Sequence, residues 1–257
     1  TSAFIELKTL VDQEEHEFAD MQARHFKARA SMALKNETLR ASFRGASDFL
    51  MGKRQSVFPD AVELEALRDR GEAARQRSLA KLPDLLEQLE TNLVANGIQV
   101  HWADTAEQAN QIIHGILDAN QADTVVKGKS MVSEEIELNH YLEARGIECL
   151  ESDMGEYLVQ LAKEAPSHIV MPVIHKNKQQ IAQLMHSRAT TPEGDPVPYS
   201  EEVDDLIGNA RAILREKFRH ADAGISGVNM AIAETGTLLL IENEGNGRMC
   251  TTVPPLH

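Results

Sequence analysis

The feature that most constrains the fold is a regular alternation that begins at Ile98. Short runs rich in β-branched residues alternate there with amphipathic runs of helical periodicity. Such alternation is typical of βαβ units, whose strands form a parallel sheet flanked by helices. The expected strands are Ile98–Ala103, Thr124–Val126, Ile147–Glu151 and His168–Val173, and the expected helices are Thr105–Ala119, Met131–Arg145, Gly155–Lys163 and Asn177–His186. The predicted fold class is therefore α/β.

The first 96 residues have a different character. They are rich in Ala, Leu, Glu, Arg and Gln and poor in β-branched residues, which favours helices. The expected helices are Glu15–Leu34, Glu37–Met51, Ala61–Arg77 and Pro83–Asn96. We therefore expect a helical arm or subdomain over residues 1–96 and an α/β core over residues 97–257. The arm either covers a sheet edge or packs against another subunit.

The last part of the chain is punctuated by proline and glycine. A loop is expected over Ala189–Tyr199, followed by a long helix that Ser200 caps and that reaches about His220. Three β-rich stretches follow, over Ile225–Ala233, Thr237–Glu242 and Met249–Val253. Hairpin-like pairing at one edge of the sheet is the simplest interpretation of these stretches.

Charge and cysteine content exclude several classes of protein. The 257 residues contain 26 basic and 40 acidic side chains, a net charge of −14, which disfavours nucleic acid as a partner. No apolar run approaches the roughly 18 residues of a membrane span, so none is expected. The two cysteines, Cys149 and Cys250, are far apart, so no zinc or iron–sulfur site is expected within the chain. A cytoplasmic protein fits best.

The sharpest local motif is the loop Lys127-Gly128-Lys129-Ser130, between a strand and a helix. In an open α/β sheet, ligands bind beyond the carboxyl ends of the strands, where helix N-termini and lysines attract anions. These four residues therefore form a candidate anion site for a small carboxylate or phosphate. In the alternative interpretation both lysines are solvated and Ser130 is only a helix cap.

A second candidate is Glu234, which lies next to Thr235 and Gly236 between apolar β-rich runs. A carboxylate in an apolar strand pair is costly unless it is hydrogen-bonded or functional. A buried glutamate with a raised pKa serves as a general base or a nucleophile. The alternative is a structural glutamate that accepts backbone N–H groups at the turn.

The third candidate is the segment Glu242-Asn243-Glu244-Gly245-Asn246-Gly247-Arg248, directly after a predicted strand. Arg248 is suited to a bidentate contact with a carboxylate or phosphate, and Asn246 offers an amide beside it. Gly-Asn-Gly is also ordinary turn chemistry, so the sequence favours a purely structural role for this segment.

Five motifs in order resemble the lactate-utilisation (LUD) domain family of B-type lactate-utilisation proteins. They are Lys127–Met131 with Glu134-Glu135, Asp153–Tyr157, Pro166–Val170, Ala233–Thr237 and Asn243–Arg248. The resemblance runs from about Arg24 to the last residue. It implies the fold shared by glucosamine-6-phosphate deaminase, ribose-5-phosphate isomerase and CoA transferases. Ligands of that fold lie at the strand ends that carry loops like Lys127–Ser130.

The resemblance also implies a function for the longer protein. It implies an iron–sulfur electron-transfer subunit that oxidises L-lactate to pyruvate with two partner subunits, a cysteine-rich A-type protein and a LUD-type C protein. The ending at Thr252–His257 resembles an interior point of the family sequence, before a ferredoxin-like region that binds two [4Fe–4S] clusters. We therefore expect a truncated chain that binds no cluster itself. The family pattern usually has a serine where this chain has Gly128.

Two other functions remain open at this point. One is a stand-alone isomerase- or CoA-transferase-like enzyme that uses Glu234 as base or nucleophile. The other is a structural domain that docks subunits through the helical segment Arg24–Lys81.

Overall fold

The computed structural model of the chain describes residues 26–168 and 171–257. It contains two compact units that divide between Val57 and Phe58. The first unit includes α2 (Phe26–Lys35) and α3 (Glu37–Val57), and Asn36 between them accepts a hydrogen bond from the Leu39 N–H. The expected helix over residues 15–34 is confirmed from Phe26 onward, and its earlier part lies outside the described residues. The expected boundary between residues 96 and 97 does not coincide with this division.

The second unit begins with two helices, α4 (Ala61–Ala80) and α5 (Leu82–Ala95). The side chain of Asp60 caps α4 by accepting hydrogen bonds from the N–H groups of Val62 and Glu63. No side chain of α4 is buried among the described residues, whereas α5 buries Leu93. Both predicted helices are confirmed.

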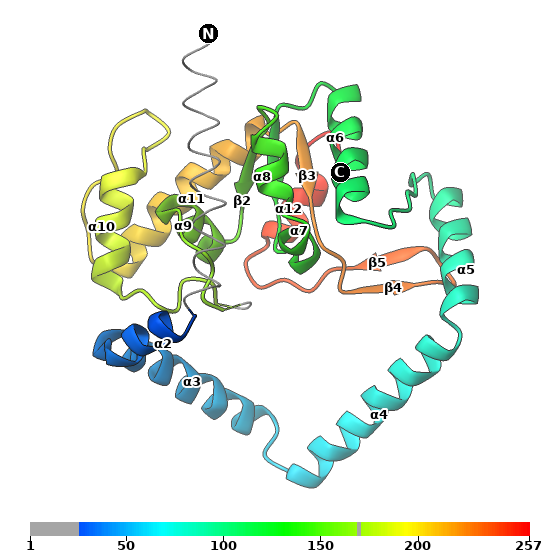
Figure 1. Cartoon of the computed structure of the whole chain (residues 1–257), viewed down its shortest axis with the longest axis horizontal. Helices are drawn as coiled ribbons and strands as arrows, with labels where there is room; N and C mark the ends of the chain where they lie inside the picture. Colours follow the sequence, from blue (N-terminus) through cyan, green and yellow to red (C-terminus); the bar gives the residue numbers. More distant parts are fainter. Residues whose placement is uncertain (1–25, 169–170) are drawn as a thin grey trace. The chain divides into compact units, whose positions relative to one another are not determined.

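A three-stranded parallel sheet forms the centre of the second unit (Figure 1). Its strands are β1 (Thr124–Lys127), β2 (Glu148–Glu151) and β3 (Ala223–Ile225), in the order β2-β1-β3. In the register, Lys127 lies opposite both Glu151 and Ile225. The parallel α/β sheet and the strands predicted near residues 124 and 147 are confirmed.

Helices cover both faces of this sheet. They are α6 (Ala106–Ala119), α7 (Met131–Glu135), α8 (Leu138–Glu143), α9 (Met154–Ala162), α10 (Lys178–Arg188) and α11 (Val203–His220). Val125 packs in a cluster with Leu117 and Leu142, whereas its neighbour Val126 packs with Phe218. Successive strand residues point to opposite faces, so this division shows that the central strand is covered on both sides.

Three predicted elements before residue 180 are wrong. Residues Ile98–Ala103 form no strand, and the described part of His168–Val173 is irregular or turn rather than strand. The helix expected over Met131–Arg145 is divided into α7 and α8, because Glu137 between them has a left-handed backbone with φ of 52°. A short apolar run does not by itself distinguish a strand from a buried loop.

The C-terminal part also differs from its prediction. Strands β4 (Met230–Ile232) and β5 (Thr237–Leu239) form a separate antiparallel hairpin rather than an extension of the main sheet. Figure 1 shows this hairpin projecting from the sheet toward α5. The stretch Met249–Val253 is not a strand, since α12 spans Asn246–Thr252. None of the helices in the described parts of the chain is long and apolar enough to span a membrane.

Candidate functional site

The carboxyl ends of the three parallel strands bring separate loops together. Lys127, Glu151 and Ile225 end their strands in register, so the residues that follow them gather at one edge of the sheet. This edge is where open α/β sheets bind ligands. A buried charged cluster lies at the strand ends, and a small pocket lies among the loops beyond them.

Lys127 is the centre of the charged cluster. Its side chain is fully buried, and its ammonium lies 2.7 Å from both Glu134 Oε1 and Glu151 Oε1 and 3.0 Å from Ser133 Oγ. Burial acts to lower the pKa of Lys127, but the two carboxylates outweigh it and raise the pKa above its ordinary value. Because an ammonium has three donors, these three acceptors saturate it. Lys127 is therefore not solvated, and it has no donor left for a ligand.

The buried Glu151 and the half-buried Glu156 extend the cluster. Glu151 Oε1 also accepts a hydrogen bond from the side chain of Asn139, at 2.7 Å. The Oε2 atoms of Glu151 and Glu156 are both buried without a hydrogen-bond partner among the described residues. Burial raises the pKa of Glu156 to about 8, and the charges of Glu151 and Asp153 add to this effect. This raised pKa favours the protonated form of Glu156, which reduces repulsion among the carboxyl groups.

The two cysteines flank this cluster and do not suit an iron–sulfur cluster. Burial raises the pKa of Cys149 to about 12 and that of Cys250 to about 11. An iron–sulfur cluster is typically held by four cysteine thiolates, whereas the chain has two cysteines. The described residues also contain no group of three or more His, Cys, Asp or Glu side chains placed to hold a metal ion.

A pocket of about 90 Å³ lies where the loops meet. Lys129 lies in its wall and forms an ion pair with Asp153 at 3.1 Å. Gly128, directly after β1, also lines it. The remaining lining residues come from the loop after β3 and from the segment before and within α12: Ser226, Gly227, Asn229, Leu240, Ile241, Glu242, Asn243, Glu244, Asn246 and Gly247. Since one water occupies about 30 Å³ in the liquid, a pocket of this size suits a ligand of only a few heavy atoms.

Two carboxylates of the pocket wall accept hydrogen bonds from backbone N–H groups. Glu244 Oε2 accepts from the Met154 N–H at the start of α9, at 3.1 Å. Glu242 Oε2 accepts from the Arg248 N–H in α12, at 2.8 Å. Burial raises the pKa of Glu244, and the hydrogen bond from Met154 acts in the opposite direction. These two backbone donors are therefore already occupied by carboxylates of the protein.

The predicted anion loop is divided between the cluster and the pocket. Gly128 and Lys129 line the pocket, whereas Ser130 caps α7 through its side-chain oxygen. The N–H of Gly128 donates to the Ile225 carbonyl at 2.7 Å, so it is not available to a ligand. A Cβ atom at Gly128 would lie 3.6 Å or more from its neighbours, so the serine of the family pattern fits here.

The structure separates the predicted Glu234 group from this edge. Glu234 and Thr235 are exposed in the turn between β4 and β5, so the expectation that Glu234 is buried is wrong. Gly236, with φ of 65°, lies against α5, and the side chain of Asn96 donates to the Thr235 carbonyl at 2.9 Å. None of the three residues lines the pocket. Burial was the reason for predicting a catalytic role for Glu234, and the structure does not provide it. The catalytic role itself stays a prediction.

The third predicted group is only partly at the pocket. Asn246 lines it and donates weakly to Ser152 Oγ at 3.5 Å. The side chain of Arg248 is 78% exposed, and its Nε lies 3.5 Å from Glu242 Oε1. Asp153 was not predicted as a site residue, and no role was assigned to Glu242 and Glu244 within the third candidate segment. Asp153 lies two residues after Glu151, the last residue of β2, and this position was the available signal.

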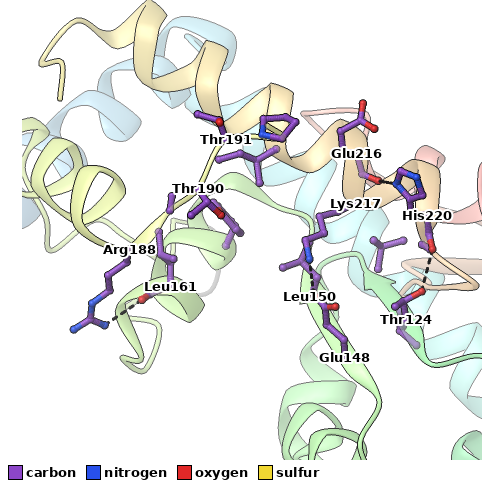
Figure 2. A pocket seen from close by; sticks show the side chains of 17 residues that line it. Thr124, Glu148, Leu150, Leu161, Arg188, Thr190, Thr191, Glu216, Lys217 and His220 are labelled. Atoms are coloured by element: carbon purple, nitrogen blue, oxygen red, sulfur yellow. Dashed lines mark hydrogen bonds and ion pairs between the residues drawn. The ribbon is translucent and has the colours of Figure 1, made fainter. Parts of the chain in front are cut away.

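A larger pocket, of about 600 Å³, lies elsewhere on the sheet (Figure 2). It is bordered by the first residues of β1 and β2, by α11 and by the segment 188–192. Its basic groups are engaged within the protein: Lys217 pairs with Glu148 at 2.5 Å, and Arg188 Nη1 donates to the carbonyls of Leu161 and Ala162. No residue predicted from the sequence as a ligand contact lines this pocket.

Comparison with known proteins now gives the class of protein. Residues 86–257 match the LUD domain family. The chain is 41% identical over 230 residues to "Lactate utilization protein B" of Bacillus subtilis (strain 168), covering 89% of this chain and 47% of that protein. It is 39% identical over 232 residues to the "Uncharacterized electron transport protein YkgF" of Escherichia coli (strain K12), covering 90% of this chain and 48% of that protein.

The chain therefore belongs to the LUD domain family, and the predicted resemblance is confirmed. It spans about half the length of the curated relatives it matches. A comparison with solved structures finds no match. The expected likeness to the deaminase, isomerase and CoA-transferase fold thus stays a prediction.

Proposed function

We propose that this chain is the LUD part of an iron–sulfur electron-transfer protein that oxidises L-lactate to pyruvate in the cytoplasm. The family match and the names of the relatives support a role in lactate utilisation and electron transport. The two partner subunits of A and C type belong to the same proposal. The two [4Fe–4S] clusters would be held by other residues of a longer protein, since the cysteines described here do not suit them.

The observation that carries the local part of this proposal is the position of Lys129. Among the residues described in the pocket wall, it is the only cationic side chain. A small carboxylate such as lactate would take the place of the Asp153 carboxylate beside the Lys129 ammonium, and Asn246 would donate to the ligand from the opposite loop. Lys127 and Ser130 would hold the loop in place rather than contact the ligand. Glu242 and Glu244 disfavour anions of higher charge, such as a phosphate, which favours a monocarboxylate.

The test uses the longer protein with its two partner subunits. Lys129→Ala should weaken equilibrium binding of L-lactate by about tenfold or more, because hydrogen bonds to charged groups contribute about 1.5–3 kcal/mol. It should also lower lactate-dependent reduction of the complex. The matched control is Lys178→Ala at the exposed start of α10, which should change neither quantity. Unchanged lactate affinity in the Lys129 variant would remove this pocket from the proposal.

The stand-alone isomerase- or CoA-transferase-like enzyme receives no support from the geometry. It requires Glu234 beside a bound substrate, whereas Glu234 is exposed at the hairpin turn and does not line the pocket. Turnover of a sugar phosphate or an acyl-CoA by the purified protein, lost in Glu234→Gln, would revive that alternative.

A further inference from the structure

The two units of the chain carry opposite charges. The described part of the first unit, residues 26–57, contains seven basic and two acidic side chains, a net charge of +5. The second unit, residues 58–257, contains 17 basic and 32 acidic side chains, a net charge of −15. A basic helical segment and an acidic α/β unit therefore occur in one chain, and surfaces of opposite charge favour association.

The basic segment has apolar surface that needs a partner. None of the 21 residues of α3, all of which the structure describes, is buried. Helices in proteins gain most of their stability by packing an apolar face against another surface. Leu34 of α2 and Phe49 of α3 are 68% and 61% exposed. The α2–α3 segment thus presents both positive charge and uncovered apolar side chains.

A groove of about 620 Å³ lies between the end of α2 and the first half of α3. Its lining includes apolar side chains, two basic ones and one acidic one: Leu34, Leu39, Phe43, Arg40, Arg44 and Glu37. Arg40 and Arg44 are four residues apart on α3, so they lie on one flank of the helix, and both are exposed. Arg40 Nη1 donates weakly to the Leu34 carbonyl at 3.5 Å. Such a groove suits an amphipathic helix with acidic flanks.

The start of α11 has the features that this groove would accept. Val203 and Ile207, one turn apart, are 53% and 52% exposed, whereas Leu206 between them is buried. The apolar stripe of α11 thus begins before the protein covers it fully. Glu202 and Asp204, next to Val203 in the sequence, are also exposed. Acidic side chains favour a helix N-terminus, which accounts for these charges but not for the exposed apolar pair.

We propose that two copies of this chain form a reciprocal dimer, in which the start of α11 of each copy docks in the α2–α3 groove of the other. The apolar pair of α11 would pack on the apolar lining of the groove, and the two acids beside it would face Arg40 and Arg44. In a two-fold dimer the same contact forms twice. A second copy is the favoured partner because it offers the helical spacing and the opposite charge together. An anionic membrane would offer only the charge.

The experiment measures self-association of the 257-residue chain by sedimentation equilibrium. The double variant R40E/R44E should dimerise about a hundredfold more weakly than the unmodified chain, and so should E202K/D204K, because like charges would then face each other. An equimolar mixture of the two variants should dimerise about as tightly as the unmodified chain. In the mixed dimer each groove meets an α11 of opposite charge. Docking of α11 within its own chain could not give this rescue.

The matched control is K53E/R54E. It makes the same change of charge in α3 at residues that do not line the groove, so dimerisation should be unchanged. All six substituted side chains are exposed, and circular dichroism checks that each variant folds. If a charge reversal prevents folding, R40A/R44A tests the same contact with a weakening of about tenfold, because each lost partner of a charged group costs about 1.5–3 kcal/mol at most.

Three outcomes would overturn the proposal. They are an unmodified chain that stays monomeric at every concentration tested, a mixture of the two variants that stays monomeric, and equal weakening in K53E/R54E. A monomeric chain that binds phosphatidylserine vesicles, and loses this binding in R40E/R44E, would assign the groove to a membrane surface instead.

Discussion

The main sheet and the β4–β5 hairpin have similar apolar sequences and opposite surroundings. Val125 and Val126 of β1 are buried on both faces of a central strand, whereas Met230 and Ile232 of β4 are exposed. The main sheet also buries the charge of Lys127. The comparison shows that the burial of a strand here depends on which helices cover it. The buried charged cluster around Lys127 lies on the sheet that helices cover.

The largest expected loss of stability comes from replacing the buried Lys127. Lys127→Met leaves the Glu151 carboxylate buried without its cation, which should lower the free energy of unfolding by about 3–5 kcal/mol. The control is Lys217→Met, whose ion pair with Glu148 is about half exposed and should contribute about 0–1 kcal/mol. Denaturant unfolding of both variants measures the difference. Equal losses would mean that the buried cluster contributes no more than a surface pair.

A smaller loss of stability is expected where β3 packs closely against α12. In Gly224→Ala the new Cβ atom would lie 1.9 Å from the Cys250 carbonyl oxygen, so β3 and α12 must move apart. Overpacking of this kind costs about 1–3 kcal/mol or more. Gly115→Ala, within α6 and with open space around it, should instead be neutral or stabilising by about 0.5–1 kcal/mol. Thermal midpoints that fall equally in both variants would contradict the packing argument.

The third prediction concerns pH. Burial raises the pKa of Glu156 from 4.5 to about 8, so the folded protein retains a proton that the unfolded chain releases. Stability should therefore fall as the pH rises from about 4.5 to about 8, because the unfolded chain then binds fewer protons. Glu156→Gln should remove this part of the pH dependence and be more stable than the original protein at pH 8. Parallel stability–pH curves for the two proteins would show that Glu156 is ionised in the fold.

The smallest effect is expected on the exposed hairpin. In the 257-residue chain, Met230→Ala should change stability by no more than about 0.5 kcal/mol, since the side chain is largely solvated. Met185→Ala, at a fully buried methionine, should cost about 2–5 kcal/mol. A large loss from Met230→Ala would mean that this face of the hairpin is covered within the chain.

Part of the fold was predictable from local patterns. The runs near residues 124 and 147 were recognised because buried parallel strands are short, apolar and bounded by helical periodicity. The β-rich stretch Met249–Val253 gave the same local signal, yet all of it except Val253 lies in α12. There Cys250 packs with Val126 and Phe218, a contact that no local pattern contains.

The candidate site was predictable in location but not in detail. The rule that ligands lie at the carboxyl ends of parallel strands led to Gly128 and Lys129, which line the pocket. It did not show that Lys127 points into the interior, because that depends on Glu134 and Glu151, which come from separate elements.

The sequence by itself determined the fold class, the family and the strand whose end forms the candidate site, since periodicity and motif order are properties of the chain. Tertiary structure decided which charges are buried and which groups meet. Lys127 meets Glu151 only when β2 pairs with β1. Glu234 lies away from the pocket because the turn of its hairpin packs against α5. The physical reason is that the burial of a side chain and the pairing of charges depend on residues distant along the chain. Secondary-structure propensity depends on adjacent residues.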